Sequence, residues 1–144
     1  MKKSMKYLAL AMVLASAAGP AAKADDLTGV DGILCAASIA TVCTPDGDCL
    51  SAPPWNWNIP GFIEIDLKAK IMRTTQASGE NRSTLVKTME RADGFILLQG
   101  MEMGRAFSFQ INEETGMVSV AVARDGVVVS VFGTCTPMAS SSVK

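Results

Sequence analysis

A series of short apolar runs, separated by turn-forming residues, is the feature that most constrains the fold. The runs are rich in Val, Ile, Phe and Thr, and a new run starts roughly every ten residues from residue 62 onward. In the run 105–111, Phe107, Phe109 and Ile111 occupy alternate positions, as in a strand with one buried face. This pattern is typical of an all-β fold made of hairpins. Seven strands are predicted, at 62–67, 71–74, 84–89, 95–101, 105–111, 117–123 and 127–132.

The stretch 33–42 is ambiguous, because it combines alanines with β-branched residues. Alanine favours a helix, whereas Ile39, Thr41 and Val42 favour a strand, and we interpret the stretch as an eighth strand. Consecutive antiparallel strands remove their two exposed edges most simply by closing into an up-and-down barrel. We therefore predict a small antiparallel β-barrel of about eight strands in meander order, with a two-sheet β-sandwich as the alternative.

Residues 1–24 have the organisation of a secretory signal peptide. A basic start is followed by an apolar run that is too short to span a bilayer comfortably, and residues 22–24 have the small-x-small pattern that signal peptidase recognises. No later segment has the roughly 18 apolar residues of a membrane-spanning helix. We expect an exported, soluble protein of the bacterial periplasm or the extracellular space. Its single all-β domain would cover residues 25–137, followed by a disordered tail at 138–144.

The net charge changes when this segment is removed. Four of the 13 Lys and Arg residues lie within residues 1–24, whereas all 14 Asp and Glu residues follow it, so the remainder has nine basic residues and a net charge of −5. A domain of that sign lacks the basic surface that attracts phosphates. We therefore expect no nucleic-acid partner.

The chain contains four cysteines and no histidine. An even number of cysteines in an exported chain is typical of disulfides, and the two-residue spacing of zinc ligands is missing. We therefore expect two disulfides, no metal and no cofactor. In a closed meander the first and last strands are neighbours, which would bring Cys35 next to Cys135, and Cys43 and Cys49 would then staple their own hairpin. A sandwich requires no particular pairing.

The sequence also lacks the residues of common catalytic sites. Without histidine it cannot form a Ser-His-Asp or Cys-His arrangement. Glu64 and Asp66 share one outward strand face, whereas glycoside hydrolysis needs two carboxyl groups across a cleft. The segment 46–48, Asp-Gly-Asp, lacks the distal Glu of a calcium-binding loop and fits a turn. We therefore expect a non-enzymatic protein.

Both tryptophans lie in the segment Trp55-Asn56-Trp57-Asn58, which has a proline on each side. Because proline disfavours a helix, we expect this segment to be extended, with both indoles on one face, roughly 7 Å apart, and both asparagines on the other. Two aromatic plates flanked by amides could stack on a flat amphipathic molecule, so these four residues are the candidate ligand-binding site. Alternatively, the tryptophans plug one end of the barrel.

Arginines at strand ends are a second candidate feature. Arg73, Arg82, Arg91 and Arg105 each lie beside a predicted turn. If the fold brings them to one rim, they could bind an anionic group or an acidic partner protein. Each alone is an ordinary solvated strand end.

Together these features predict an exported, non-enzymatic β domain that binds a small amphipathic ligand or an envelope partner at the Trp55/Trp57 end. The alternatives are a protein-interaction or inhibitor module that uses its rim loops, and a structural envelope accessory without a small ligand. Whether the interior of the fold is hollow or packed distinguishes these functions. A cavity lined by Phe107, Phe109 and the valines would favour a small-molecule carrier, whereas a packed interior would leave only surface binding.

Overall fold

The computed structural model describes residues 26–78 and 81–138, which form ten antiparallel β-strands and no α-helix. The elements are β1 (Gly32–Cys43), β2 (Cys49–Ala52), η1 (Pro54–Trp57), β3 (Phe62–Asp66), β4 (Ile71–Thr74), η2 (Gln76–Ser78), β5 (Ser83–Leu85), β6 (Thr88–Ala92), β7 (Phe95–Glu102), β8 (Arg105–Asn112), β9 (Met117–Arg124) and β10 (Val127–Pro137), where η marks a 3-10 helix. In this part of the chain, no helix is long and apolar enough to cross a membrane.

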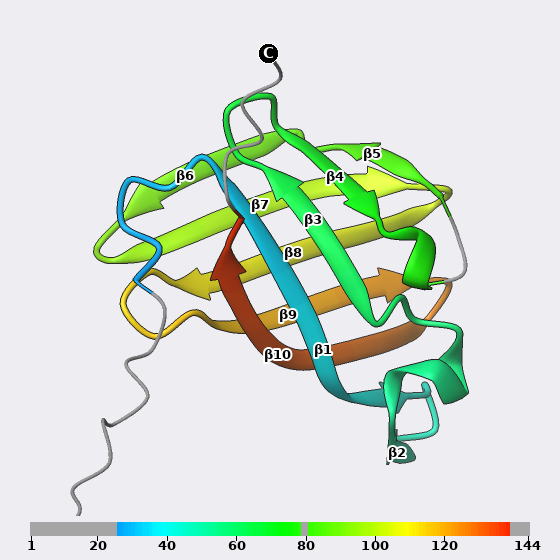
Figure 1. Cartoon of the computed structure of the whole chain (residues 1–144). Coiled ribbons are helices and arrows are strands. Elements are labelled where there is room, and N and C mark those ends of the chain that lie inside the picture. The colour runs from blue at the N-terminus through cyan, green and yellow to red at the C-terminus, as the bar shows by residue number, and fades with distance from the viewer. Residues whose placement is uncertain (1–25, 79–80, 139–144) are drawn as a thin grey trace, which may run out of the picture.

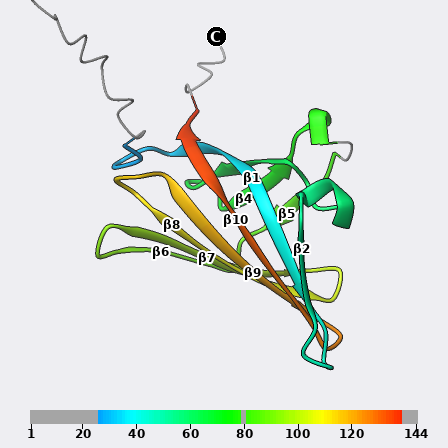
Figure 2. The same ribbon diagram turned by 90° about the horizontal axis from the view of Figure 1, so that it is seen from below.

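The strands form one sheet in the order β5-β4-β3-β1-β10-β9-β8-β7-β6, and β2 pairs only with β1. The sheet curls over itself into a half-barrel, so that β1, β3 and β4 lie across β7, β8 and β9 (Figure 1). The view from below shows the two parts of the sheet meeting along β9 and β10 and diverging from there (Figure 2). The predicted all-β class is confirmed, and because all strands share one sheet, the two-sheet alternative is wrong.

The two outermost strands of this order, β5 and β6, are consecutive in the chain. Between them the Val86 N–H donates to the Lys70 carbonyl at 2.9 Å, and the Lys87 N–H donates to the Gln99 carbonyl at 2.8 Å. The chain therefore passes from the β4 side of the sheet to the β7 side within these two residues, and the predicted strand 84–89 is divided. This division and the additional strand β2 raise the strand number to ten. The hydrogen-bonded order ends at β5 and β6, so the sheet is a half-barrel where a closed barrel was predicted.

The first and last strands are hydrogen-bonded neighbours, as predicted. Cys35 in β1 lies opposite Cys135 in β10, and the two form a disulfide. Cys43 lies opposite Cys49 across the β1–β2 hairpin, and these form the second disulfide. Both predicted pairings are confirmed, and no described cysteine is free.

A bulge bends β1 where it crosses β10. The register shifts between Ala37 and Ile39, which leaves Ser38 out of the ladder. Gly133 lies opposite Ala37, and a Cβ at Gly133 would be only 2.0 Å from the carbonyl oxygen of Ala36. Glycine is required here, because the two backbones approach more closely than a side chain permits.

One part of the half-barrel is filled by closely packed apolar side chains. Leu27, which precedes β1, is fully buried, and its N–H donates to the Glu113 carbonyl at 2.7 Å. This part forms the packed core of the fold. Its other fully buried aliphatic side chains are Ile33, Ile65, Ile96, Leu98 and Ile111.

The predicted signal peptide, 1–24, lies outside the described residues, as do residues 139–144 of the predicted tail. Met138, the first residue of that tail, follows β10 directly and donates its N–H to the Gly32 carbonyl at 2.8 Å.

Candidate ligand-binding site

The part of the half-barrel that Leu27 and its neighbours do not fill contains a cavity of about 680 Å³ that is open to solvent on one side. This volume falls within the range of about 300–1,000 Å³ that is usual for ligand pockets. Several of the valines in its wall are only half-buried, because they border the cavity. The apolar wall contributed by β8, β9 and β10 consists of Phe107, Phe109, Val118, Val120, Val122, Val127, Val129 and Val131.

Cross-strand pairs between β8 and β9 build the centre of this wall. Phe107 lies opposite Val122, and Phe109 lies opposite Val120. The two phenyl rings pack edge to face, with centroids 5.8 Å apart. The ring of Phe107 also lies over Gly100 of β7, where a Cβ would come within 2.4 Å of it. Gly100 therefore lets this ring lie back against the sheet and leaves room for the cavity.

Charged and polar side chains lie on one side of the cavity, where β5 meets the β7–β8 hairpin. The Thr84 hydroxyl donates to Glu102 Oε1 at 2.6 Å, and Arg82 Nη1 lies 3.9 Å from Glu102 Oε2. Arg82 and Glu102 are mostly buried, with 27% and 28% of their side chains exposed. Arg105 lies opposite Glu102 in the β7–β8 register, and all four residues line the cavity.

The strand-end arginines gather at this cavity, with one exception. Arg91, the exception, forms an ion pair with Glu113 at 2.7 Å and also donates to the Val30 carbonyl. The prediction that arginines share one rim therefore holds for three of the four that were named, and a further arginine of β9 joins them. The arginines that line the cavity are Arg73, Arg82, Arg105 and Arg124.

The tryptophan segment was predicted to be extended, but in the structure it is helical. It forms η1, which begins at Pro54 and is followed by Asn58 with a left-handed φ of 53°. Proline is well suited to the first position of a helix, since its fixed φ matches the helical value. Three residues complete one turn of a 3-10 helix, so residues two apart point in different directions. The prediction that both indoles share one face is therefore wrong: Trp55 is 72% exposed, whereas Trp57 is half-buried and lines the cavity.

Only half of the predicted tryptophan site contributes to the cavity. Trp57 and Asn58 belong to the segment 57–60, which forms part of the wall, whereas Trp55 and Asn56 do not line it. The indole Nε1 of Trp57 is buried and has no hydrogen-bond partner among the described residues. Trp57 thus covers one side of the cavity, as in the plug alternative, while Trp55 faces solvent.

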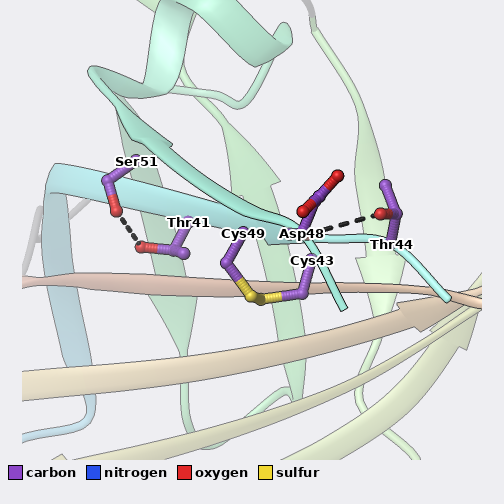
Figure 3. The surroundings of a disulfide bond; sticks show 6 residues. All are labelled: Thr41, Cys43, Thr44, Asp48, Cys49 and Ser51. Atoms are coloured by element: carbon purple, nitrogen blue, oxygen red, sulfur yellow. Dashed lines mark hydrogen bonds between the residues drawn. A yellow bond between two sulfur atoms is a disulfide. The ribbon is translucent and has the colours of Figure 1, made fainter. Parts of the chain in front are cut away.

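The second disulfide fixes the hairpin that leads into η1 (Figure 3). The hydroxyl groups of Thr41 and Ser51 are hydrogen-bonded across the hairpin at 2.8 Å, and Thr44 Oγ1 donates to the Asp48 carbonyl at 3.3 Å (Figure 3). The segment 46–48 is part of the connecting turn, with Gly47 at a φ of 90°. The prediction of a turn at this place is confirmed.

The two carboxylates of β3, Glu64 and Asp66, lie outside the cavity wall. Asp66 accepts a hydrogen bond from the Ala69 N–H at 2.7 Å and so stabilises the β3–β4 turn. Glu64 lies opposite Arg73 in the β3–β4 register, and neither Glu64 nor Asp66 lines the cavity. Within residues 26–78 and 81–138, no group of three or more His, Cys, Asp or Glu side chains is placed to hold a metal ion.

No protein-family model matches the chain, and no curated protein matches its sequence. The cavity wall and its charged side are therefore the guide to function.

Two polar residues of the site, Thr84 and Glu102, were not predicted from the sequence. Glu102 continues the inward alternation of Ile96 and Leu98 along β7, so its position on the inner face could have been derived from strand periodicity. Glu102 contacts Thr84, which lies 18 residues earlier in the chain and belongs to another strand. No local sequence pattern indicates such a contact.

Proposed function

We propose that the protein is an exported, non-enzymatic carrier that binds a small amphipathic ligand inside the half-barrel. The observation that carries this proposal is the cavity of about 680 Å³, whose wall is apolar on most sides and charged on one. Apolar side chains beside a cavity lack the packing contacts of a filled core, and a bound ligand would supply them. The two disulfides are compatible with an oxidising compartment outside the cytoplasm.

The ligand would contact Trp57 and Asn58 on one side and the valines of β9 and β10 on the other. This retains part of the predicted tryptophan site and moves its centre into the half-barrel. An amphipathic molecule suits the wall, because its apolar part can lie against the valines while its polar part reaches Arg105 and its neighbours.

Filling the cavity tests this function. N-phenylnaphthylamine, a neutral probe whose fluorescence increases in apolar surroundings, should bind the purified, oxidised protein. Val122→Phe places a larger side chain in the cavity and should weaken probe binding by about tenfold or more. Ala121→Phe is the matched control, because it adds a ring to the outer face of the same strand and leaves the cavity unchanged.

Urea unfolding of both variants shows whether each is folded under the binding conditions. Failure of the wild-type protein to bind the probe would contradict the carrier function. Equal binding by folded Val122→Phe and folded Ala121→Phe would contradict it as well, since the probe would then lie elsewhere.

Exposed apolar side chains near η1 favour a second candidate, the protein-interaction or inhibitor module. Trp55 is 72% exposed and Leu50 is 64% exposed. Tryptophan is enriched among the residues that contribute most to protein interfaces. Capture of an envelope protein by the wild type, lost in Trp55→Ala while probe binding is unchanged, would support this function. The structural accessory without a ligand has no comparable support.

A further inference from the structure

The charges around the cavity differ in sign from those of the chain as a whole. The chain of 144 residues has a formal net charge of −1. The cavity wall nevertheless includes four arginines and only two acidic residues, Glu102 and Asp125. Positive charge is therefore concentrated at this cavity of an acidic protein, which favours a negatively charged ligand there.

Arg105 is the central residue of this concentration. It is half-buried and lines the cavity, and its side chain forms no ion pair or hydrogen bond with any other described residue. Its cross-strand neighbour Glu102 is held toward β5, because its carboxylate accepts the hydrogen bond from Thr84 and lies 3.9 Å from Arg82. Glu102 therefore does not neutralise Arg105, whose guanidinium group has no ion-pair partner among the described residues.

The surroundings of Arg105 make an anion a good partner. A guanidinium group presents several N–H donors in a planar fork that matches the geometry of a carboxylate or another oxyanion. An ion pair beside an apolar wall is screened less by water than one on an open surface. The valines of β9 and β10 would hold a hydrocarbon chain, at about 0.8 kcal/mol for each CH₂ group removed from water.

We propose that the ligand of this cavity is an amphipathic anion with a single hydrocarbon chain. Its acidic head group binds Arg105 at the charged side, and its chain lies between Trp57 and the valines of β9 and β10. This inference rests on the proposed carrier function and adds the chemical class of the ligand.

Competition between probes that share one chain and differ in head group tests the inference. Dodecanoate, dodecanol and dodecyltrimethylammonium, each below its critical micelle concentration, compete with N-phenylnaphthylamine for the purified, oxidised protein. Arg105→Gln should raise the dodecanoate concentration needed for half-displacement by about tenfold. The same substitution should leave the value for dodecanol within about twofold, since an uncharged head gains little from the guanidinium.

Two further variants control for net charge and for folding. Lys68→Gln removes the same charge from the exposed β3–β4 turn, outside the cavity wall, and should leave both values unchanged. Arg105→Lys keeps the charge but not the planar fork, so its affinity for dodecanoate should lie between those of the wild type and Arg105→Gln. Arg105→Glu should reverse the preference, so that dodecyltrimethylammonium displaces the probe better than dodecanoate does.

The outcomes separate the two proposals. If the wild type does not bind N-phenylnaphthylamine, the carrier function fails and the inference fails with it. Alternatively, the probe binds, and dodecanoate displaces it equally well from Arg105→Gln and from Lys68→Gln. In that case the ligand is not selected by an acidic head group, and only the inference is overturned. An Arg105→Lys variant that loses as much dodecanoate affinity as Arg105→Gln would overturn it too, because charge would then not be the cause.

Discussion

Trp55 and Trp57 have different surroundings although only one residue separates them. Trp55 is 72% exposed, whereas Trp57 is half-buried in the cavity wall with its Nε1 enclosed. The 3-10 helix produces this difference, because it turns successive side chains around its axis. The two indoles should therefore report on different parts of the molecule.

Single-tryptophan variants make this difference measurable. In Trp55→Phe the remaining Trp57 should emit at shorter wavelength and resist quenching by acrylamide, and its emission should change when N-phenylnaphthylamine binds. In Trp57→Phe the remaining Trp55 should be quenched readily and should not respond to the probe. Similar quenching of the two variants would contradict the described geometry of η1.

The direction of the two indoles could not be predicted from the local sequence. Pro54 and Pro60 fit an extended segment, and Pro54 fits equally well the first position of a helix. The left-handed conformation of Asn58 ends the helix, and asparagine adopts that conformation more readily than most residues. The sequence thus contains a helix start at Pro54 and a helix end at Asn58. No local feature decides between this helix and an extended segment with alternating side chains.

At the level of elements, β1 connects the parts of the sheet, because it pairs with β10, β3 and β2 along its 12 residues. Most strands were predictable, since a strand with one buried face alternates in the sequence. β2 was not predictable, because this strand has only four residues and they are largely exposed. The division of 84–89 was not either, since Val86 and Lys87 change sheet partners without a glycine or proline to mark the change.

The two disulfides join elements of different kinds and should differ in their effect on stability. Cys35–Cys135 links residues 100 positions apart, whereas Cys43–Cys49 closes a separation of only 6. By chain entropy, a bridge across a loop of about 100 residues contributes about 5 kcal/mol, and one across so short a loop about half as much. Cys35→Ala/Cys135→Ala should therefore lower the free energy of unfolding in urea by about twice as much as Cys43→Ala/Cys49→Ala. A larger loss in the hairpin variant would show that β1–β10 closure is not the principal restraint.

At the level of the whole molecule, the half-barrel has a packed part and a hollow part. The packed part contains Leu27 and the fully buried aliphatic residues around it, and the hollow part is the cavity of about 680 Å³. This division was not predictable, because the alternation of Phe107 and Phe109 is the same whether the interior opposite them is filled or open. Packing depends on how far the two parts of the sheet diverge, which is set by long-range pairing and by the bulge at Ser38.

The central claim, that the hollow part is the ligand site, is tested most directly by methyl NMR of the oxidised protein during titration with N-phenylnaphthylamine. The aromatic rings of the probe shift the resonances of nearby methyl groups. We predict shifts at Val120, Val122 and Val129, which line the cavity, and none at Val128 on the outer face or at Leu98 in the packed core. Shifts confined to Val128 and its surface neighbours, with the cavity valines unchanged, would contradict the claim.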